Sequence, residues 1–138
     1  MTQQPRKPQL CVGAIMVHDD RLLLVQRAHP PAAGEWSIPG GRVEPGETLA
    51  EALVREVREE TNLECVCGAL VGIAERIDEY GHLVIIDYFA TVYDETTLSA
   101  SSDAAAAAWV PLVDVAELRL VDGLAEFLHD HCILRTIV

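Results

Sequence analysis

The sequence predicts a layered domain of the α/β (α+β) class, a single domain over residues 1–138 with a core of about 10–134. Two observations lead to this class. Strand-like and helix-like segments are mixed along the chain, and short turns typical of hairpins join neighbouring strand segments. The chain has 138 residues, of which 50% are hydrophobic and 23% charged. This length and composition suffice for one hydrophobic core and exclude a disordered chain.

The first part of the chain has the pattern of a β-hairpin followed by a long loop. Residues 10–18 form an apolar run rich in β-branched side chains, which favours a strand. Asp19 and Asp20 indicate a turn, and residues 21–27 then form the second strand of the hairpin. Residues 28–46 are rich in proline and glycine and predict a structured loop, long enough to suggest a function.

A helix is predicted over residues 47–61. Thr48 and Glu51 have the spacing of a capping box, in which each side chain bonds the backbone N–H of the other residue. Asn62 follows the last turn, and asparagine is second only to glycine in tolerating the left-handed conformation that ends helices.

Two more strand-like segments follow the helix. Residues 64–77 and 82–93 have strand patterns, and residues 78–81 form a hairpin turn between them. Residues 94–103 are polar and predict a loop. The last part of the chain is less regular. Residues 104–110 are ambiguous, because the alanines favour a helix whereas the Trp-Val-Pro end favours a strand. Residues 113–118 and 121–134 predict helices.

Charge and cysteine usage limit the class of partner. The net charge is −12, which argues against binding to a nucleic acid polymer, since such a protein needs a basic face. No apolar run approaches the ~18 residues of a membrane span, and the first residues lack the pattern of a signal peptide. None of the four cysteines forms a CxxC motif. We therefore expect reduced thiols, a cytoplasmic location and no membrane partner.

The predicted helix places three carboxylates beside its apolar side. At 100° per residue, Glu56, Glu59 and Glu60 share an arc that borders the arc of Leu53 and Val57. Like charges at this spacing repel, and a hard divalent cation would remove that cost. A charged surface helix with ordinary ion pairs is the alternative explanation.

A spaced motif favours the cation. Gly41 is followed after five residues by Glu47, and after seven more by the run from Arg55 to Leu63. This spacing resembles the Nudix box, G-x5-E-x7-R-E-U-x-E-E-x-G-U, where U is aliphatic. Asn62 is the one departure from it, at a position where the family usually has glycine. The preceding residues 36–41 also resemble the W-x-x-P-G-G segment of many Nudix proteins.

The resemblance implies a Nudix-type α/β/α sandwich with a mixed sheet and a loop–helix–loop metal site. It implies a hydrolase that needs Mg²⁺ or Mn²⁺, and a structural ion pair between Glu47 and Arg55. By position, the implied metal ligands are Glu56, Glu59, Glu60 and the Gly41 carbonyl, completed by an acid from a later loop. We expect this acid to be Asp103, with Glu75 and Asp87 as rivals. We expect Glu59 to be the general base, with Glu56 and Asp103 as alternatives.

The substrate implied by the resemblance is a small nucleotide. Residues 27–36 and 84–89 resemble the ADP-ribose pyrophosphatase-like branch, which favours cleavage of a nucleoside diphosphate derivative to a nucleoside monophosphate and a phosphorylated product. Tyr80 instead suits a dinucleoside polyphosphate hydrolase, and a MutT-like nucleoside triphosphate pyrophosphohydrolase is a third candidate. A non-catalytic nucleotide-sensing module is the alternative of another class. Dimers are frequent in the family, so a homodimer is compatible with this assignment. The candidate substrate-binding residues are Arg27, Trp36, Tyr80 and Phe89; each of the three aromatic side chains either stacks on a base or packs in the core.

Overall fold

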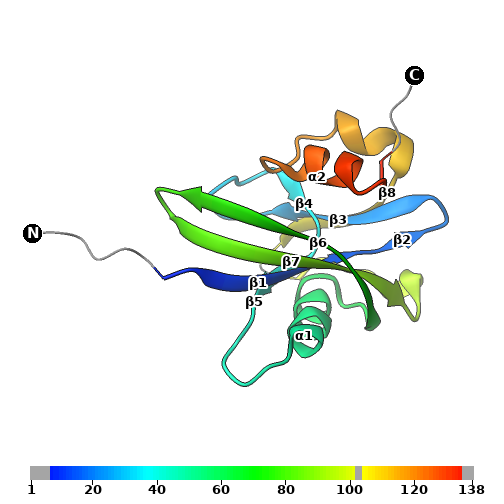
Figure 1. Ribbon diagram of the computed structural model, residues 1–138. Coiled ribbons are helices and arrows are strands. Elements are labelled where there is room, and N and C mark those ends of the chain that lie inside the picture. Colours follow the sequence, from blue (N-terminus) through cyan, green and yellow to red (C-terminus); the bar gives the residue numbers. More distant parts are fainter. Residues whose placement is uncertain (1–6, 102–103, 135–138) are drawn as a thin grey trace, which may run out of the picture.

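The computed structural model describes residues 7–101 and 104–134, with two four-stranded sheets lying between two helices. Helix α1 (Leu49–Thr61) lies on one side of the strands and α2 (Leu124–Asp130) on the other (Figure 1). The first sheet has the order β5 (Gly40–Arg42), β1 (Gln9–Ile15), β7 (Gly81–Val92), β6 (Cys65–Asp78). In the second sheet, β3 (Arg21–Arg27) pairs with β2 (Val17–His18), β4 (Trp36–Ser37) and β8 (Ala104–Pro111).

The first sheet is mixed, as the sequence predicts. Strand β1 runs parallel to β7 and antiparallel to β5, whereas β6 and β7 form a long antiparallel hairpin. A parallel pair needs a crossover connection. Here the chain between β1 and β7 contains part of the second sheet and α1.

Two core clusters explain the layering. On β1 the buried Ala14 belongs to the cluster under α1, whereas its neighbour Ile15 belongs to the cluster under α2. On β3, Leu23 belongs to the first cluster, and Leu22 and Leu24 belong to the second. Successive strand side chains point to opposite faces, so these central strands are buried on both sides. This arrangement confirms the expected α/β/α sandwich.

The N-terminal hairpin differs in part from the prediction. The apolar run 10–18 divides at Met16, and only Val17 and His18 pair with β3. The residues before Met16 join the first sheet instead, because they are apolar on both faces and fit its buried interior. The predicted turn is present, and Asp19 and Asp20 both adopt positive φ angles of 50° and 58°.

Helix α1 begins and ends as predicted. The Glu51 N–H donates to the Thr48 hydroxyl (3.1 Å), and the Thr48 N–H donates to the Glu51 carboxylate (3.2 Å). Asn62 adopts the left-handed conformation with φ 62°, and its N–H donates to the Arg58 carbonyl.

Replacing Thr48 with Ala is expected to lower the free energy of unfolding by ~1 kcal/mol, because it removes the acceptor for an otherwise unpaired helix N–H. Denaturant unfolding measures this change. The variant Ser99→Ala, at an exposed loop position, serves as a control, and an equal loss there would mean that the cap has no special role.

The C-terminal third corrects two expectations. The ambiguous residues 104–110 lie in strand β8, which pairs with β3. The predicted helix over 113–118 is a 3₁₀-helix, η2 (Leu112–Glu117). The predicted helix over 121–134 is shorter, since Gly123 and Cys132 adopt φ angles of 84° and 62° that no right-handed helix allows. No helix among the described residues is long and apolar enough to cross a membrane.

Candidate active site

The glycine-rich loop brings its backbone against both β1 and α1. A Cβ atom on Gly40 would lie 2.2 Å from the Val12 carbonyl oxygen. A Cβ atom on Gly41 would lie 2.5 Å from the carboxyl carbon of Glu56. Neither position has room for a side chain. The main chain of Gly41 therefore lies directly beside the first carboxylate of the acidic helix.

Arg55 connects the loop to this helix. Its Nε and Nη2 atoms donate to the two carboxylate oxygens of Glu47 at 2.7 and 2.8 Å, and Nη2 also donates to the Arg42 carbonyl. Its Nη1 atom donates to Glu56 at 2.9 Å and to Glu59 at 3.2 Å. The Arg55 guanidinium, together with the Glu44 N–H, lowers the pKa of Glu47 to about 2. The ion pair expected between Glu47 and Arg55 is thus present, and it is bidentate.

Replacing Arg55 with Lys is expected to keep the positive charge and to lose the bidentate hydrogen bonding to Glu47, because an ammonium group cannot donate along two parallel directions. If the site works as proposed below, kcat should fall by roughly tenfold or more, while far-UV circular dichroism stays unchanged. Steady-state kinetics provide the measurement. Full activity in this variant would show that positive charge alone is sufficient there.

The three helix carboxylates have different environments. The Glu56 side chain is 16% exposed and that of Glu59 is 58% exposed. Burial raises the pKa of Glu56, and Arg55 opposes this shift. Burial, followed by the charge of Glu56, raises the pKa of Glu60 to about 8, against the Gly40 N–H and the charge of Arg27. These groups therefore repel one another at the edge of the core.

This donor set fits a hard divalent cation. Its members are oxygen donors, and the half-buried Glu60 carboxylate gains stability from added positive charge. Within residues 7–101 and 104–134, no three His, Cys, Asp or Glu side chains form a ready-made cation cage. Arg55 holds Glu56 and Glu59 through hydrogen bonds, and Asp103 lies outside the described residues.

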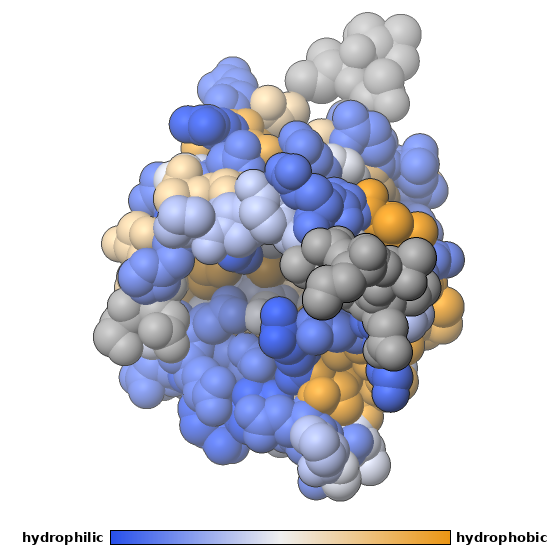
Figure 2. Space-filling view, turned by 90° about the vertical axis from the view of Figure 1, so that its left-hand side faces the viewer, coloured by the Kyte–Doolittle hydropathy of each residue, from blue (hydrophilic) through white to orange (hydrophobic). Residues whose placement is uncertain are grey.

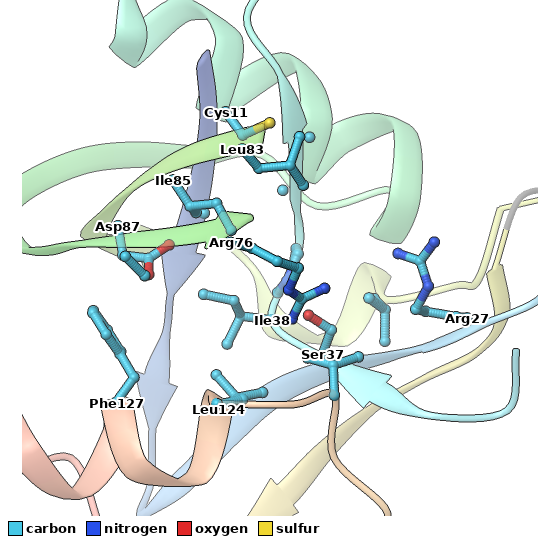
Figure 3. Close-up of a pocket in the computed structure, with 18 of the residues that line it drawn as sticks. Cys11, Arg27, Ser37, Ile38, Arg76, Leu83, Ile85, Asp87, Leu124 and Phe127 are labelled. Atoms are coloured by element: carbon cyan, nitrogen blue, oxygen red, sulfur yellow. The ribbon is translucent and has the colours of Figure 1, made fainter. Parts of the chain in front are cut away.

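A cavity of about 600 Å³ opens between the two sheets beside Glu60. Its wall includes Gly41 from β5, Glu60 from α1, Arg27 from β3, and Asp87 from β7. Figure 2 shows a largely hydrophilic face that is hollowed in the middle, with hydrophobic residues in the depth of the hollow. In the view of Figure 3, Arg27 lies to one side and Asp87 to the other, with Ser37, Ile38 and Arg76 between them.

The four candidate substrate-binding residues do not come together. Arg27 lines the cavity, and its Nε donates to the Pro31 carbonyl at 2.9 Å. Trp36 packs against the core cluster under α2. Tyr80 and Phe89, on the β6–β7 hairpin, are 63% and 42% exposed. None of these three aromatic side chains belongs to the cavity wall. Of the four candidates, Arg27 is the one that lies on the cavity wall.

Other residues on the wall were not singled out from the sequence. Arg76 reaches across from β6, and its Nη2 donates to the Asp122 carbonyl at 2.9 Å. Phe127 comes from α2. For β7 the alternation of side chains along a strand predicts that Leu83, Ile85 and Asp87 share one face, and this face lines the cavity. No comparable signal relates α2 to this cavity.

The two rival acids occupy different positions. Glu75 lies on the cavity wall with its side chain 59% exposed, and it pairs with His82 at 3.0 Å. Asp87 is only 3% exposed, and its Oδ1 atom has no hydrogen-bond partner among the residues described. Burial raises the pKa of Asp87 to about 6, against a smaller effect of His131.

The protein is thus an α/β/α sandwich with a loop–helix–loop site. In this site a glycine-rich segment leads into an acidic helix, Arg55 holds the carboxylates, and a cavity adjoins Glu60. The model of the NUDIX domain family matches residues 7–131. The chain therefore belongs to the Nudix family.

Named relatives and structures agree with this assignment. The chain is 35% identical over 100 residues to the human protein "8-oxo-dGDP phosphatase NUDT18", covering 72% of this chain and 31% of that protein. It is 35% identical over 113 residues to "ADP-ribose pyrophosphatase" of Methanocaldococcus jannaschii, covering 80% of this chain and 66% of that one. The crystal structure of a MutT NUDIX hydrolase from Burkholderia pseudomallei superposes with a TM-score of 0.80 and 29% identity, covering 88% and 96% of the two chains. The chain thus spans a third to two thirds of the length of these two curated relatives.

Proposed function

We propose that this protein is a Mg²⁺- or Mn²⁺-dependent hydrolase that cleaves the pyrophosphate linkage of a small nucleotide. Nudix hydrolases in general need such cations. The observation that carries the proposal is the cavity wall, which places Glu60 and the Gly41 backbone beside a space of about 600 Å³. That volume suits a nucleotide. Arg27 on the same wall supplies positive charge for a phosphate.

In this proposal Glu56, Glu59 and Glu60, with the Gly41 carbonyl and Asp103, hold the cation. When bound, the cation supplies charge stabilisation at the phosphoryl oxygens and lowers the pKa of a coordinated water. Glu59 takes the proton from the attacking water, because it is the most solvent-accessible of the carboxylates held by Arg55. Glu56 and Asp103 are the alternative bases. Arg55 keeps Glu56 and Glu59 in place, and Glu47 orients Arg55.

The favoured substrate is an ADP-ribose-like nucleoside diphosphate derivative, split into a nucleoside monophosphate and a phosphorylated product. The archaeal relative named ADP-ribose pyrophosphatase supports this choice. The human relative named 8-oxo-dGDP phosphatase favours a second candidate, a MutT-like reaction on nucleoside di- or triphosphates.

A substrate panel with Mg²⁺ or Mn²⁺ tests the proposal, with products separated by chromatography. The panel contains ADP-ribose, dinucleoside polyphosphates, sugar nucleotides, nucleoside triphosphates and 8-oxo-dGDP, each repeated with EDTA. Metal-dependent release of AMP and a phosphosugar from ADP-ribose is the expected result. If no compound is cleaved while nucleotides still raise the melting temperature, the protein is a nucleotide-sensing module instead.

A further inference from the structure

Asp87 occupies a position that the neighbouring strands leave free for it. It lies on β7 between β1 and β6, and its partners in register are Gly13 and Gly72. A Cβ atom on Gly13 would lie 2.1 Å from the Asp87 Oδ1 atom. A Cβ atom on Gly72 would lie 2.5 Å from Nε2 of His131. The two glycines therefore make room for the carboxyl group and for the adjacent imidazole.

One oxygen of this carboxyl group has no partner among the described residues to account for its burial. Asp87 is 3% exposed, and Oδ1 accepts no hydrogen bond from the residues the structure describes. Two neighbouring side chains have contacts of their own, since Arg76 Nη2 donates to the Asp122 carbonyl and His131 Nδ1 contacts the Phe127 carbonyl at 2.9 Å. A buried polar atom without a partner is costly. Such a group calls for a partner that is missing from the protein itself.

The surroundings of Asp87 indicate the shape and polarity of that partner. The wall around the carboxyl group presents the aromatic ring of Phe127 and the aliphatic side chains of Ile38, Ile85 and Leu124 (Figure 3). A flat heteroaromatic ring with an N–H group on its edge satisfies one acceptor in such a wall.

We propose that Asp87 is the specificity-determining residue for the nucleobase, accepting an N–H from the edge of the base. The phosphates then lie toward Arg27 and Glu60 on the same cavity wall. This inference rests on the proposed function, because it takes the ligand to be a nucleotide. It assigns the base to the part of the cavity near α2 and the reaction to the part near α1.

Binding without catalysis tests the assignment. Calorimetry in EDTA compares ADP, GDP, CDP and UDP, with inorganic pyrophosphate as the base-free probe. The proteins are the wild type, Asp87→Asn, Asp87→Leu and the control Glu64→Gln, which changes an exposed carboxylate that is not on the cavity wall. Asp87→Asn keeps the shape and exchanges one acceptor for a donor, so it preserves a folded comparison. Circular dichroism verifies the fold of each variant.

The expected result is specific to the base. Asp87→Leu lowers the affinity for the preferred nucleotide at least tenfold, and Asp87→Asn changes the order of the affinities for the four nucleotides. Pyrophosphate binding stays within twofold in both Asp87 variants, and Glu64→Gln changes none of the affinities. Unchanged affinities, an equal loss for all nucleotides and pyrophosphate, or no nucleotide binding by the wild type would each overturn the proposal. Because EDTA prevents metal-dependent cleavage, this result is independent of the substrate panel above.

Discussion

Replacing Glu59 with Gln is expected to lower kcat for the cleaved nucleotide by roughly 10²–10³-fold, the share of a barrier that a metal-bound water and its base supply. The amide is a weaker ligand and cannot accept the proton at neutral pH. The fold should survive the change. The Glu59 side chain is 58% exposed, and its ion pair with Arg55 at 3.2 Å contributes about 0.5 kcal/mol or less.

Glu64→Gln is the matched control for this variant. Glu64 is 54% exposed and pairs with Arg58, which lies on α1 as Arg55 does. The substitution therefore removes the same charge from a similar ion pair. Its kcat should equal that of the wild type, and both variants should unfold at similar denaturant concentrations. Near-wild-type turnover by Glu59→Gln would reject Glu59 as base and ligand. The experiment would then move to Glu56→Gln and Asp103→Asn.

The acidic helix could be predicted from the sequence because its determinants are local. The capping residues Thr48 and Glu51 are three residues apart, and the Glu47–Arg55 pair spans eight. Helix geometry accounts for the capping pair, whereas Glu47 precedes the helix and meets Arg55 through the loop, so this ion pair followed from the resemblance to the spaced motif. The roles of Glu56, Glu59 and Glu60 in catalysis stay a prediction, because they depend on a ligand.

The far part of the cavity could not be predicted, because its residues meet only through tertiary structure. The sequence offers Asp87 only as a rival metal-ligating acid and does not predict that Gly13, Gly72 and Phe127 are its neighbours. Those neighbours come from β1, β6 and α2. The expected roles of Trp36, Tyr80 and Phe89 failed to converge for a related reason. Aromatic residues suit cores and ligand sites equally well, and only the sheet register separates the two.

The buried carboxyl group also predicts an unusual dependence of stability on pH. The pKa of Asp87 is raised from 3.8 to about 6, chiefly by burial. A raised acid pKa means that the folded state binds more protons than the unfolded state between these two values, so stability falls as pH rises through this window and levels off above it. The full shift corresponds to roughly 3 kcal/mol, and an effect of about 1–3 kcal/mol is expected once the polarity of the cavity is allowed for.

Asp87→Asn should remove this dependence, since an amide stays neutral throughout. Urea unfolding at pH 4 to 8 measures the difference in stability between variant and wild type, which should grow in favour of the variant up to about pH 6 to 7 and then stay constant. The slope, and not the absolute offset, is the relevant quantity, because a buried amide has a pH-independent cost of its own.

His131 is the titratable group that acts on Asp87, so His131→Gln should raise the pH at which the stability difference levels off. A variant that gains stability while losing nucleotide discrimination would show that the carboxyl group is retained for its ligand. A difference that does not vary with pH would mean that Asp87 ionises in the folded state as it does in the unfolded chain, and the desolvated environment inferred for it would be wrong.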